Sequence, residues 1–471
     1  MSRESRLLKN TAIIAIGNIC TKCISFLMLP LYTSILSTDE YGTVDLINTY
    51  VTLLIIILTL QFEQGLFRFL IEYRGNNKEQ REYLSTAFFS VLSINILFCI
   101  IMVPVLALLN YKYTFYLVLW SVVGTLNALI LQVPRGFGNN AIYATGSFIG
   151  GSSNVILNVI LIAILRYEII GMLWANIISQ GLSAIYITLR VKLWKIIKIT
   201  EIDKICFREL CNYSFPLIPY TLCWWVINAS DRQIINIFLG TSANGIYSIA
   251  NKFPSTFSLV TGIFQTAWTE SVAENVNDDD RDYFYQDMVN KTIRFYSSGN
   301  IGIIAVIPLV FRFLVKNDFT DAYYYIPILM AAVLFHSITS LYGSIYFAFK
   351  ETKKVAWTTA LAAIVNIAVN VALIKWIGLY AAAISTLVAY MIVFIIRQFD
   401  IQKYTCIKLN KEYLLCEIIV YIFVYISYYS RNCWLQLFVL ILLIPYCFYQ
   451  NKEIILSLLK KIISVITKSK R

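Results

Sequence analysis

The sequence predicts an all-α polytopic membrane protein of about 14 transmembrane helices, on the strength of its composition and of the spacing of its apolar runs. Of the 471 residues, 58% are hydrophobic and 14% are charged, and the mean hydropathy is +0.68. Ordinary soluble domains are far less apolar. The apolar residues gather in runs of roughly 20 residues, the length of one helical crossing of a bilayer. Turn and charge signals separate the runs.

The first run follows the basic segment at residues 1–10 and is longer than the core of a signal peptide, so we expect it to remain as the first span. A basic amphipathic connector then divides the chain after the sixth span. The predicted spans are residues 11–36, 43–71, 84–109, 113–134, 141–165, 169–189, 213–239, 244–269, 292–315, 323–349, 355–374, 379–396, 414–429 and 434–449.

The distribution of basic residues predicts the orientation. The loops on the side of the N-terminus hold 28 of the 39 Lys and Arg residues, and the opposite loops hold 6. Basic residues concentrate in cytoplasmic loops, so both termini are expected in the cytoplasm. Because this topology explains the net charge of +12, no nucleic-acid partner is needed.

The chain also contains an internal repeat. Asn154 and Asn158 in the first half match Asn366 and Asn370 in the second, and LSTDEYG at 36–42 matches LGTSANG at 239–245. The offset between matched positions stays nearly constant along the chain, so one unit is duplicated. Since each unit has an even number of spans, the two halves share one orientation. Substrate sites of such transporters lie at the repeat interface, which favours alternating access.

The repeat defines the expected domains. Residues 1–190 form an N-lobe of spans one to six, residues 191–212 the connector, and residues 213–399 a C-lobe of spans seven to twelve. Residues 400–450 add spans thirteen and fourteen. Residues 451–471 form a basic amphipathic tail, which we expect to lie on the anionic cytoplasmic leaflet.

Three stretches of the chain resemble the bacterial polysaccharide, or O-antigen type, flippases of the multidrug, oligosaccharidyl-lipid and polysaccharide exporter superfamily. They are LLKNTAIIAIGNICTKCISFLMLPLYTSILSTDEYGTVDL, FPLIPYTLCWWVINASDRQIINIFLGTSANGIYSIANKFP and AIVNIAVNVALIKWIGLYAAAIS. The resemblance implies two six-helix lobes in a V. It also implies movement of an undecaprenyl-diphosphate-linked oligosaccharide from the inner to the outer leaflet of the bacterial cytoplasmic (inner) membrane. The pathway would be O-antigen, lipopolysaccharide, capsule or exopolysaccharide synthesis. The polymerase and chain-length proteins of that pathway would be partners.

Cations inside the spans are the candidate ligands of a lipid diphosphate, since ionisable residues in a membrane usually face a cavity. Lys22 lies near the middle of span one with Asn18 on the same helical face, and Lys252 lies in span eight. The alternative for each basic side chain is snorkelling to the head groups, which suits Arg294 in particular. The full set of predicted substrate-binding residues is Lys22, Arg68, Lys252, Arg232, Arg294, Asn18, Gln61 and Gln64.

Arg68 shares a predicted helical stripe with Gln61 and Gln64, at spacings of three and four. Three acidic residues are candidates for gating or coupling: Glu63, Asp231 and Glu270. Asp231 and Arg232 are neighbours and cannot face each other on a helix, so we expect a structural or outer-gate role. Glu63 is expected either to pair structurally with Arg68 or to carry a coupling proton.

No metal site or cofactor is predicted, because Cys20 and Cys23 form a C-x-x-C inside an apolar run with no second ligand pair. Two other functions are weighed. A cation-coupled multidrug exporter of the same superfamily would typically use acidic rather than basic side chains. A polytopic glycosyltransferase or polymerase would need a catalytic face, for which the short outside loops leave little room.

Overall fold

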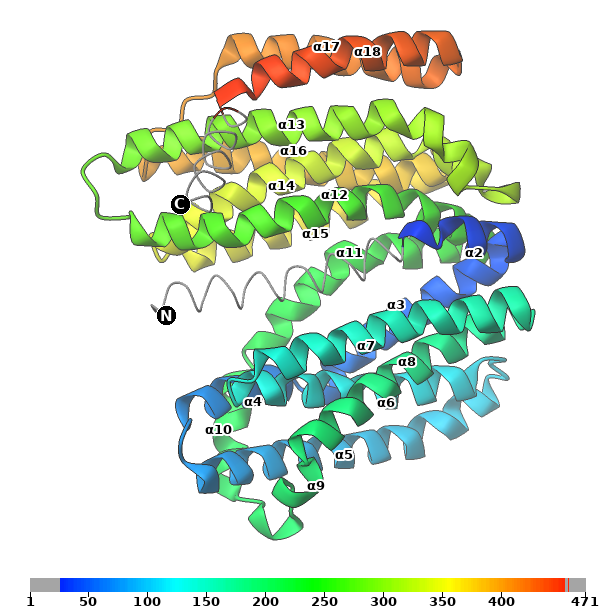
Figure 1. Cartoon of the computed structure of the whole chain (residues 1–471), viewed down its shortest axis with the longest axis vertical. Helices are drawn as coiled ribbons and strands as arrows, with labels where there is room; N and C mark the ends of the chain where they lie inside the picture. Colours follow the sequence, from blue (N-terminus) through cyan, green and yellow to red (C-terminus); the bar gives the residue numbers. More distant parts are fainter. Residues whose placement is uncertain (1–25, 454–455, 457–471) are drawn as a thin grey trace, which may run out of the picture. The chain divides into compact units, whose positions relative to one another are not determined.

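A computed structural model describes residues 26–453 and residue 456, and these residues are helical with no strands (Figure 1). The helices are α2 (Leu29–Ile35), α3 (Thr38–Thr59), α4 (Phe62–Glu72), α5 (Asn77–Leu108), α6 (Thr114–Gly136), α7 (Asn140–Asn158), α8 (Glu168–Val191), α9 (Leu193–Ile196), α10 (Lys204–Ser214), α11 (Leu217–Leu239), α12 (Thr241–Glu274), α13 (Arg281–Leu314), α14 (Ile326–Ala348), α15 (Thr352–Ile377), α16 (Leu379–Asp400), α17 (Lys411–Ser430) and α18 (Cys433–Gln450). A π-helical turn (Val159–Ile164) follows α7. Short 3₁₀ segments lie at Ile199–Glu201, Asn317–Tyr324 and Ile401–Lys403.

Eleven helices in the described part of the chain are long and apolar enough to cross a membrane. They correspond to spans two to six and nine to fourteen of the sequence prediction. Spans seven and eight are helices α11 and α12. Residues 11–25 of span one lie outside the described residues, and its last part contains α2; most of the tail also lies outside them. The prediction of an all-α polytopic membrane protein is therefore confirmed.

Several helix ends follow from local sequence. The α3 helix begins with a capping box, in which Ser37 accepts a hydrogen bond from the Glu40 backbone and the Glu40 side chain accepts one from Ser37. The starts of α5, α17 and α18 are capped by asparagine side chains that accept hydrogen bonds from backbone N–H groups: Asn76, Asn410 and Asn432. The capping side chains accept hydrogen bonds from backbone N–H groups of the first helical turn, which have no partner within the helix. The helices therefore begin at these polar residues, outside the apolar runs.

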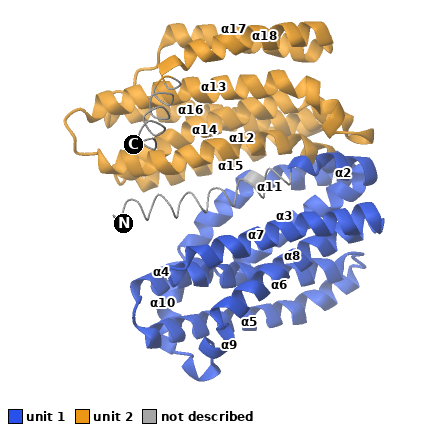
Figure 2. Cartoon of the chain, viewed as in Figure 1, with its two compact units in different colours: residues 1–245 blue, residues 246–471 orange. Residues whose placement is uncertain are grey.

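The described helices form two compact units that divide after Gly245 (Figure 2). In the first unit α6 is the central helix, and α3, α4, α5, α7 and α8 all pack against it. The connector helix α10 packs against α4 and α5, and α11 packs against α3. Span seven thus belongs to the first compact unit, although by sequence it opens the second repeat.

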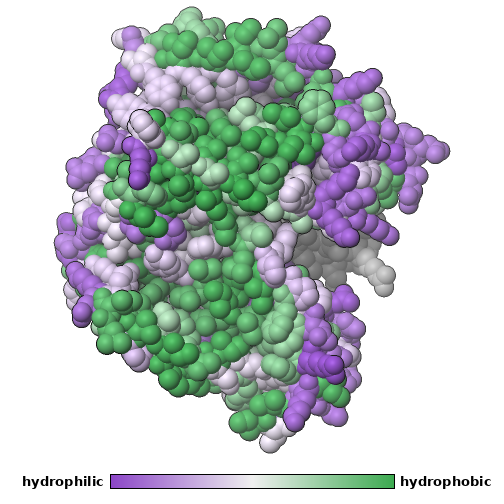
Figure 3. Space-filling view, turned by 180° about the vertical axis from the view of Figure 1, so that it is seen from behind, coloured by the Kyte–Doolittle hydropathy of each residue, from purple (hydrophilic) through white to green (hydrophobic). Residues whose placement is uncertain are grey.

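In the second unit α14 packs against α13, α15 and α16, and the α17–α18 hairpin packs against α13. The hairpin turns apolar side chains outward, including Ile418, Ile422 and Ile441. In each unit apolar residues cover the long helices, and hydrophilic residues gather toward helix ends (Figure 3). That distribution suits helices with a lipid-facing surface.

The matched asparagines of the repeat have matching roles in the two units. Asn154 on α7 donates to Ser179 on α8 at 3.3 Å, and Asn366 on α15 donates to Thr386 on α16 at 3.1 Å. Asn158 and Asn370 are both buried. Polar side chains of this kind hold helix pairs together where no hydrophobic driving force separates protein from lipid.

Candidate functional site

The two matched turns of the repeat meet within the first unit. A Cβ atom on Gly42 would lie 1.9 Å from the Thr241 carbonyl oxygen, and one on Gly245 would lie 2.0 Å from the Thr38 carbonyl oxygen. Gly42 is matched to Gly245 and Thr38 to Thr241, so the two contacts are reciprocal. Only glycine allows two backbones to approach so closely. The matched glycines of the two repeat units therefore form a tight crossing between the starts of α3 and α12, which we call the glycine crossing.

Polar side chains reinforce the glycine crossing. Thr38 and Ser242 share a hydrogen bond of 2.7 Å, Thr241 donates to Asp39, and Asn244 donates to the Gly42 carbonyl oxygen at 3.1 Å. Asn244 is fully buried. Asp39 therefore contributes to the contact between the two matched turns.

An ion pair lies next to the glycine crossing. Arg232 on α11 donates to Asp45 on α3 at 2.7 Å, and Asn244 lies 3.4 Å from the same carboxylate oxygen. The two charged side chains are 23% and 14% exposed, so solvent screens this pair less than a surface pair. Arg232 was predicted as a substrate ligand, but its guanidinium already holds α3 against α11. Asp45 was missed, although an acidic residue inside an apolar run is a visible signal.

Asp231 is buried, with 5% of its surface exposed. Its helix neighbour Arg232 reaches α3 through Asp45. Further along the same seam, Gln233 accepts from Tyr50 at 2.9 Å and Trp225 donates to the Thr49 carbonyl oxygen at 3.2 Å. The α3–α11 contact is thus a polar seam along most of its length.

The predicted second span is not one continuous helix. The α3 helix ends at Thr59, Leu60 and Gln61 adopt positive φ angles of 51° and 59°, and α4 begins at Phe62. Gln61 is buried at this break and accepts from Thr221 on α11 at 3.1 Å. The prediction of one helical stripe with Gln61, Gln64 and Arg68 is therefore wrong, because Gln61 belongs to the break.

Gln64 and Arg68 are exposed on α4, and Arg68 pairs with Glu72 at 3.5 Å. Glu63, by contrast, is only 7% exposed, and its Oε2 atom has no hydrogen-bond partner among the described residues. The expected pairing of Glu63 with Arg68 is therefore wrong. Since a buried carboxylate needs a neutralising partner, the alternative prediction of a protonatable Glu63 is retained.

In the second unit the predicted residues do not converge on one point. Lys252 is half-buried on α12, Glu270 is exposed on the same helix, and the Arg294 guanidinium on α13 lies 5.2 Å from the ring centre of Tyr413 on α17. Arg294 therefore contacts an aromatic face. Lys22 and Asn18 lie outside the described residues.

The sequence prediction ended span twelve at residue 396 and counted Arg397 among the 28 basic residues of the cytoplasmic loops; this is wrong, because α16 continues to Asp400. Arg397 is 5% exposed inside the second unit, where it donates to the Thr339 carbonyl oxygen at 2.7 Å and to Thr358 at 2.8 Å. Thr339 lies on α14 and Thr358 on α15, so Arg397, on α16, links the three helices. Its repeat counterpart Arg190 is exposed.

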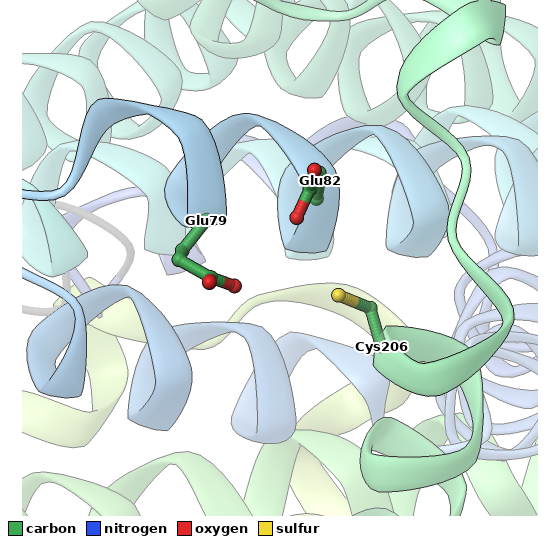
Figure 4. A group of neighbouring side chains, drawn as sticks. All are labelled: Glu79, Glu82 and Cys206. Atoms are coloured by element: carbon green, nitrogen blue, oxygen red, sulfur yellow. The ribbon is translucent and has the colours of Figure 1, made fainter.

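One group of metal-ligating side chains lies at the connector (Figure 4). Ligand atoms of Glu79, Glu82 and Cys206 all lie within 4.8 Å of one another. Burial, with the carboxylates around it, raises the pKa of the Cys206 thiol to about 12, so the thiol stays protonated at neutral pH. A metal ligand must be a thiolate, so the raised pKa weakens metal binding, and the three side chains lie where α10 packs against α5.

The Asp203 side chain caps α10 by accepting from the backbone N–H groups of Ile205 and Cys206 at 2.7 and 3.0 Å. The Cys206 hydrogen bond is the largest effect that lowers the pKa of the Asp203 carboxyl. The connector is thereby an ordered helix on the first unit rather than a free linker.

Comparison with known families decides the identity of the chain. Residues 7–269 match the family described as polysaccharide biosynthesis protein, which is more than half of the chain. The chain belongs to this polysaccharide biosynthesis family. No curated protein sequence matches this family member.

Solved structures agree with the family at the level of the fold. This polysaccharide biosynthesis protein is similar to the lipid II flippase MurJ in an inward closed conformation, with a TM-score of 0.73 and 16% identity over 94% of this chain and 100% of that one. It is similar to an inward-facing multidrug resistance MATE family transporter of the MOP superfamily, with a TM-score of 0.69 and 13% identity over 81% of this chain and 95% of that one. A MOP superfamily transporter from Pyrococcus furiosus gives a TM-score of 0.58 and 13% identity, over 84% and 96%.

Proposed function

We propose that this protein is a flippase that moves an undecaprenyl-diphosphate-linked oligosaccharide from the inner to the outer leaflet of a bacterial cytoplasmic membrane. The observation that carries the proposal is the match of residues 7–269 to the polysaccharide biosynthesis family, which spans helices one to eight of the predicted topology. Transport proceeds by alternating access and involves no chemical step. The pathway is that of O-antigen, lipopolysaccharide, capsule or exopolysaccharide synthesis.

The fold supports a lipid substrate. The likeness to MurJ covers 94% of this chain. The α17 and α18 helices, of 20 and 18 residues, are together longer than the part of the chain left uncovered, so the likeness includes at least part of this hairpin. The MATE transporters match a smaller share of the chain, 81% and 84%. Helical structure beyond twelve spans is thus a feature that this protein shares with a lipid flippase structure.

The proposed ligands of the diphosphate are Lys22 and Lys252, with Gln64 and Arg68 as further polar contacts on the exposed face of α4. A diphosphate carries at least two negative charges, and lysine binds phosphate as a compact point charge. Arg232 is assigned to the α3–α11 seam instead, because of its bond to Asp45. Both termini face the cytoplasm in this proposal, and the polymerase and chain-length proteins receive the product.

A binding measurement tests the substrate class. In detergent, undecaprenyl-diphosphate oligosaccharide should raise the melting temperature of the purified protein in a dose-dependent manner. Lys252→Gln should weaken this shift, while Lys375→Gln at the end of α15 serves as the matched control. A melting temperature that responds to cationic drugs and ignores the lipid would overturn the proposal.

A cation-coupled multidrug exporter is the second candidate. The observations that favour it are the likeness to MATE transporters and the buried, unpartnered carboxylate oxygen of Glu63. An enzymatic role as glycosyltransferase or polymerase has no comparable support.

A further inference from the structure

The α17–α18 hairpin joins α13 through a seam of polar side chains, although its other faces are apolar. Tyr421 donates to Asn300 at 3.1 Å, and Asn451 donates to Ser298 at 2.9 Å. Asn300 and Ser298 are buried on α13. A helix pair held only by lipid exclusion would not need such groups, so this polar seam, the α13 seam, calls for a separate explanation.

The α13 seam contains a carboxyl group, that of Glu417 on α17. Glu417 is 4% exposed, while its neighbour Ile418 is 56% exposed. Tyr446 on α18 donates to its Oε2 atom at 2.5 Å, and its Oε1 atom is buried with no hydrogen-bond partner among the described residues. None of the ion pairs found in the described chain involves Glu417.

An unpaired carboxylate at this depth is costly, because burial removes its hydration without supplying a counter-ion. A proton on Oε1 removes the charge and needs only one oxygen atom. A sodium ion would instead need several converging oxygen ligands. The groups that face the carboxyl are Tyr413 and Tyr421 on α17, Tyr446 and Cys447 on α18, and Ser297 on α13. Arg294 on α13 acts through Tyr413.

A polar pocket of the second unit shares residues with the α13 seam. The pocket measures about 330 Å³, and its lining includes Lys291, Arg294, Asn451 and Glu453. Two of these residues also belong to the seam: Arg294 lies over the Tyr413 ring, and Asn451 bonds Ser298. Tyr413 in turn lies one helical turn before Glu417, and its buried hydroxyl faces Ser297 and the Glu417 carboxyl. The side chain of Tyr413 therefore lies between Arg294, in the pocket lining, and the Glu417 carboxyl.

We propose that Glu417 binds and releases a proton through this pocket. On uptake, a proton from pocket water bonds to Oε1 and the carboxylate becomes a neutral carboxylic acid. On release, the same O–H bond breaks and the proton returns to water. The proton site rests only on residues of the α13 seam and does not depend on what the protein transports. Its use as a step that couples proton flow to transport rests on the proposed function.

Infrared spectroscopy of the full-length protein in liposomes tests the site without reference to transport. The C=O stretching band of a protonated carboxyl should be present in the native protein and lost as the pH rises. Glu417→Gln should lose the component of this band that Glu63→Gln, at the other buried glutamate of the described residues, retains. Glu412→Gln, an exposed acid on the first turn of the same helix, should retain it. Tyr446→Phe removes the donor to the carboxylate, so its band should persist to higher pH.

The outcomes separate the two proposals. An unchanged band in Glu417→Gln overturns the proton site, as does a site that responds to sodium and ignores pH. If Glu417→Gln fails to fold, an unchanged titration in Tyr446→Phe overturns it instead. In flipping assays, Glu417→Gln should lose stimulation by a pH gradient while Glu412→Gln keeps it. A native protein that moves no lipid defeats the proposed function, whereas the infrared result still decides the site.

Discussion

At the scale of single residues, the clearest stabilising contact is the ion pair of Asp45 and Arg232. Its 2.7 Å bond is largely shielded from solvent. A hydrogen bond between charged groups contributes roughly 1.5–3 kcal/mol. We expect Asp45→Ala to lower the unfolding free energy by about that amount, measured by thermal or denaturant unfolding in detergent.

A double-mutant cycle with Arg232→Ala should show coupling between the two side chains. Arg68→Gln is the matched control, because its 3.5 Å contact with Glu72 is exposed and should contribute less than about 1 kcal/mol. Additive effects of the two seam variants would contradict the assignment of Arg232 to the α3–α11 contact.

The Cys206 thiol gives a pH-dependent prediction. Its pKa is raised from 9.0 to about 12, first by burial and then by the neighbouring carboxylates. The unfolded chain therefore loses this proton at lower pH than the folded chain does. The contribution of Cys206 to stability is complete below pH 9 and is lost as the pH rises toward about 12.

Alkylation followed by mass spectrometry checks this prediction. At pH 8 Cys206 should react much more slowly than Cys406, which is exposed in the loop after α16. Equal rates for the two cysteines would show that the thiol is neither buried nor protonated as described.

Some residue roles were accessible from the sequence and others were not. Asp45 and Glu417 are acids within apolar runs, and the cost of charge in a membrane would have been enough to find both, although neither was predicted as a site residue. The burial of Arg397 was not accessible in this way, because its repeat counterpart Arg190 is exposed. Only the packing of α14 and α15 decides that difference.

At the scale of elements, the glycine crossing should tolerate no side chain. A methyl group on Gly42 or Gly245 would meet a carbonyl oxygen at 1.9 or 2.0 Å, and a backbone atom cannot move aside as a flexible side chain can. Overpacking of this kind costs about 1–3 kcal/mol. Gly42→Ala should therefore lower the melting temperature and the yield of folded protein.

Gly262→Ala provides the control for the crossing. Gly262 lies within α12 with nothing within 4 Å of an added Cβ, so alanine there should be neutral or slightly stabilising. A Gly42→Ala protein as stable as Gly262→Ala would mean that the two turns do not meet as the repeat implies.

The break between α3 and α4 shows where element prediction from sequence ends. Leu60 and Gln61 carry none of the usual break signals, since neither is Gly or Pro. The positive φ angles are held by tertiary contacts, among them the bond from Thr221 to Gln61. A pattern within one span contains no information about a partner so distant in the sequence.

At the scale of the whole molecule, the helix count and the duplication could be predicted because both are periodic features of the chain. The proposed topology remains to be tested. In a chain whose native cysteines are replaced, Asp318→Cys in the segment after α13 should react with a membrane-impermeant maleimide from outside the cell. Asp279→Cys, between α12 and α13, should react only after permeabilisation. The opposite pattern would invert the orientation derived from the basic loops.

The central claim is that the protein carries a lipid-linked oligosaccharide. Its most direct test is reconstitution in liposomes, with a fluorescent undecaprenyl-diphosphate oligosaccharide placed on one leaflet and its appearance on the other followed over time. The account predicts transfer that depends on the protein and no export of a cationic dye under the same conditions. Dye export with lipid transfer no faster than in protein-free liposomes would contradict it, and would identify the chain as a multidrug exporter.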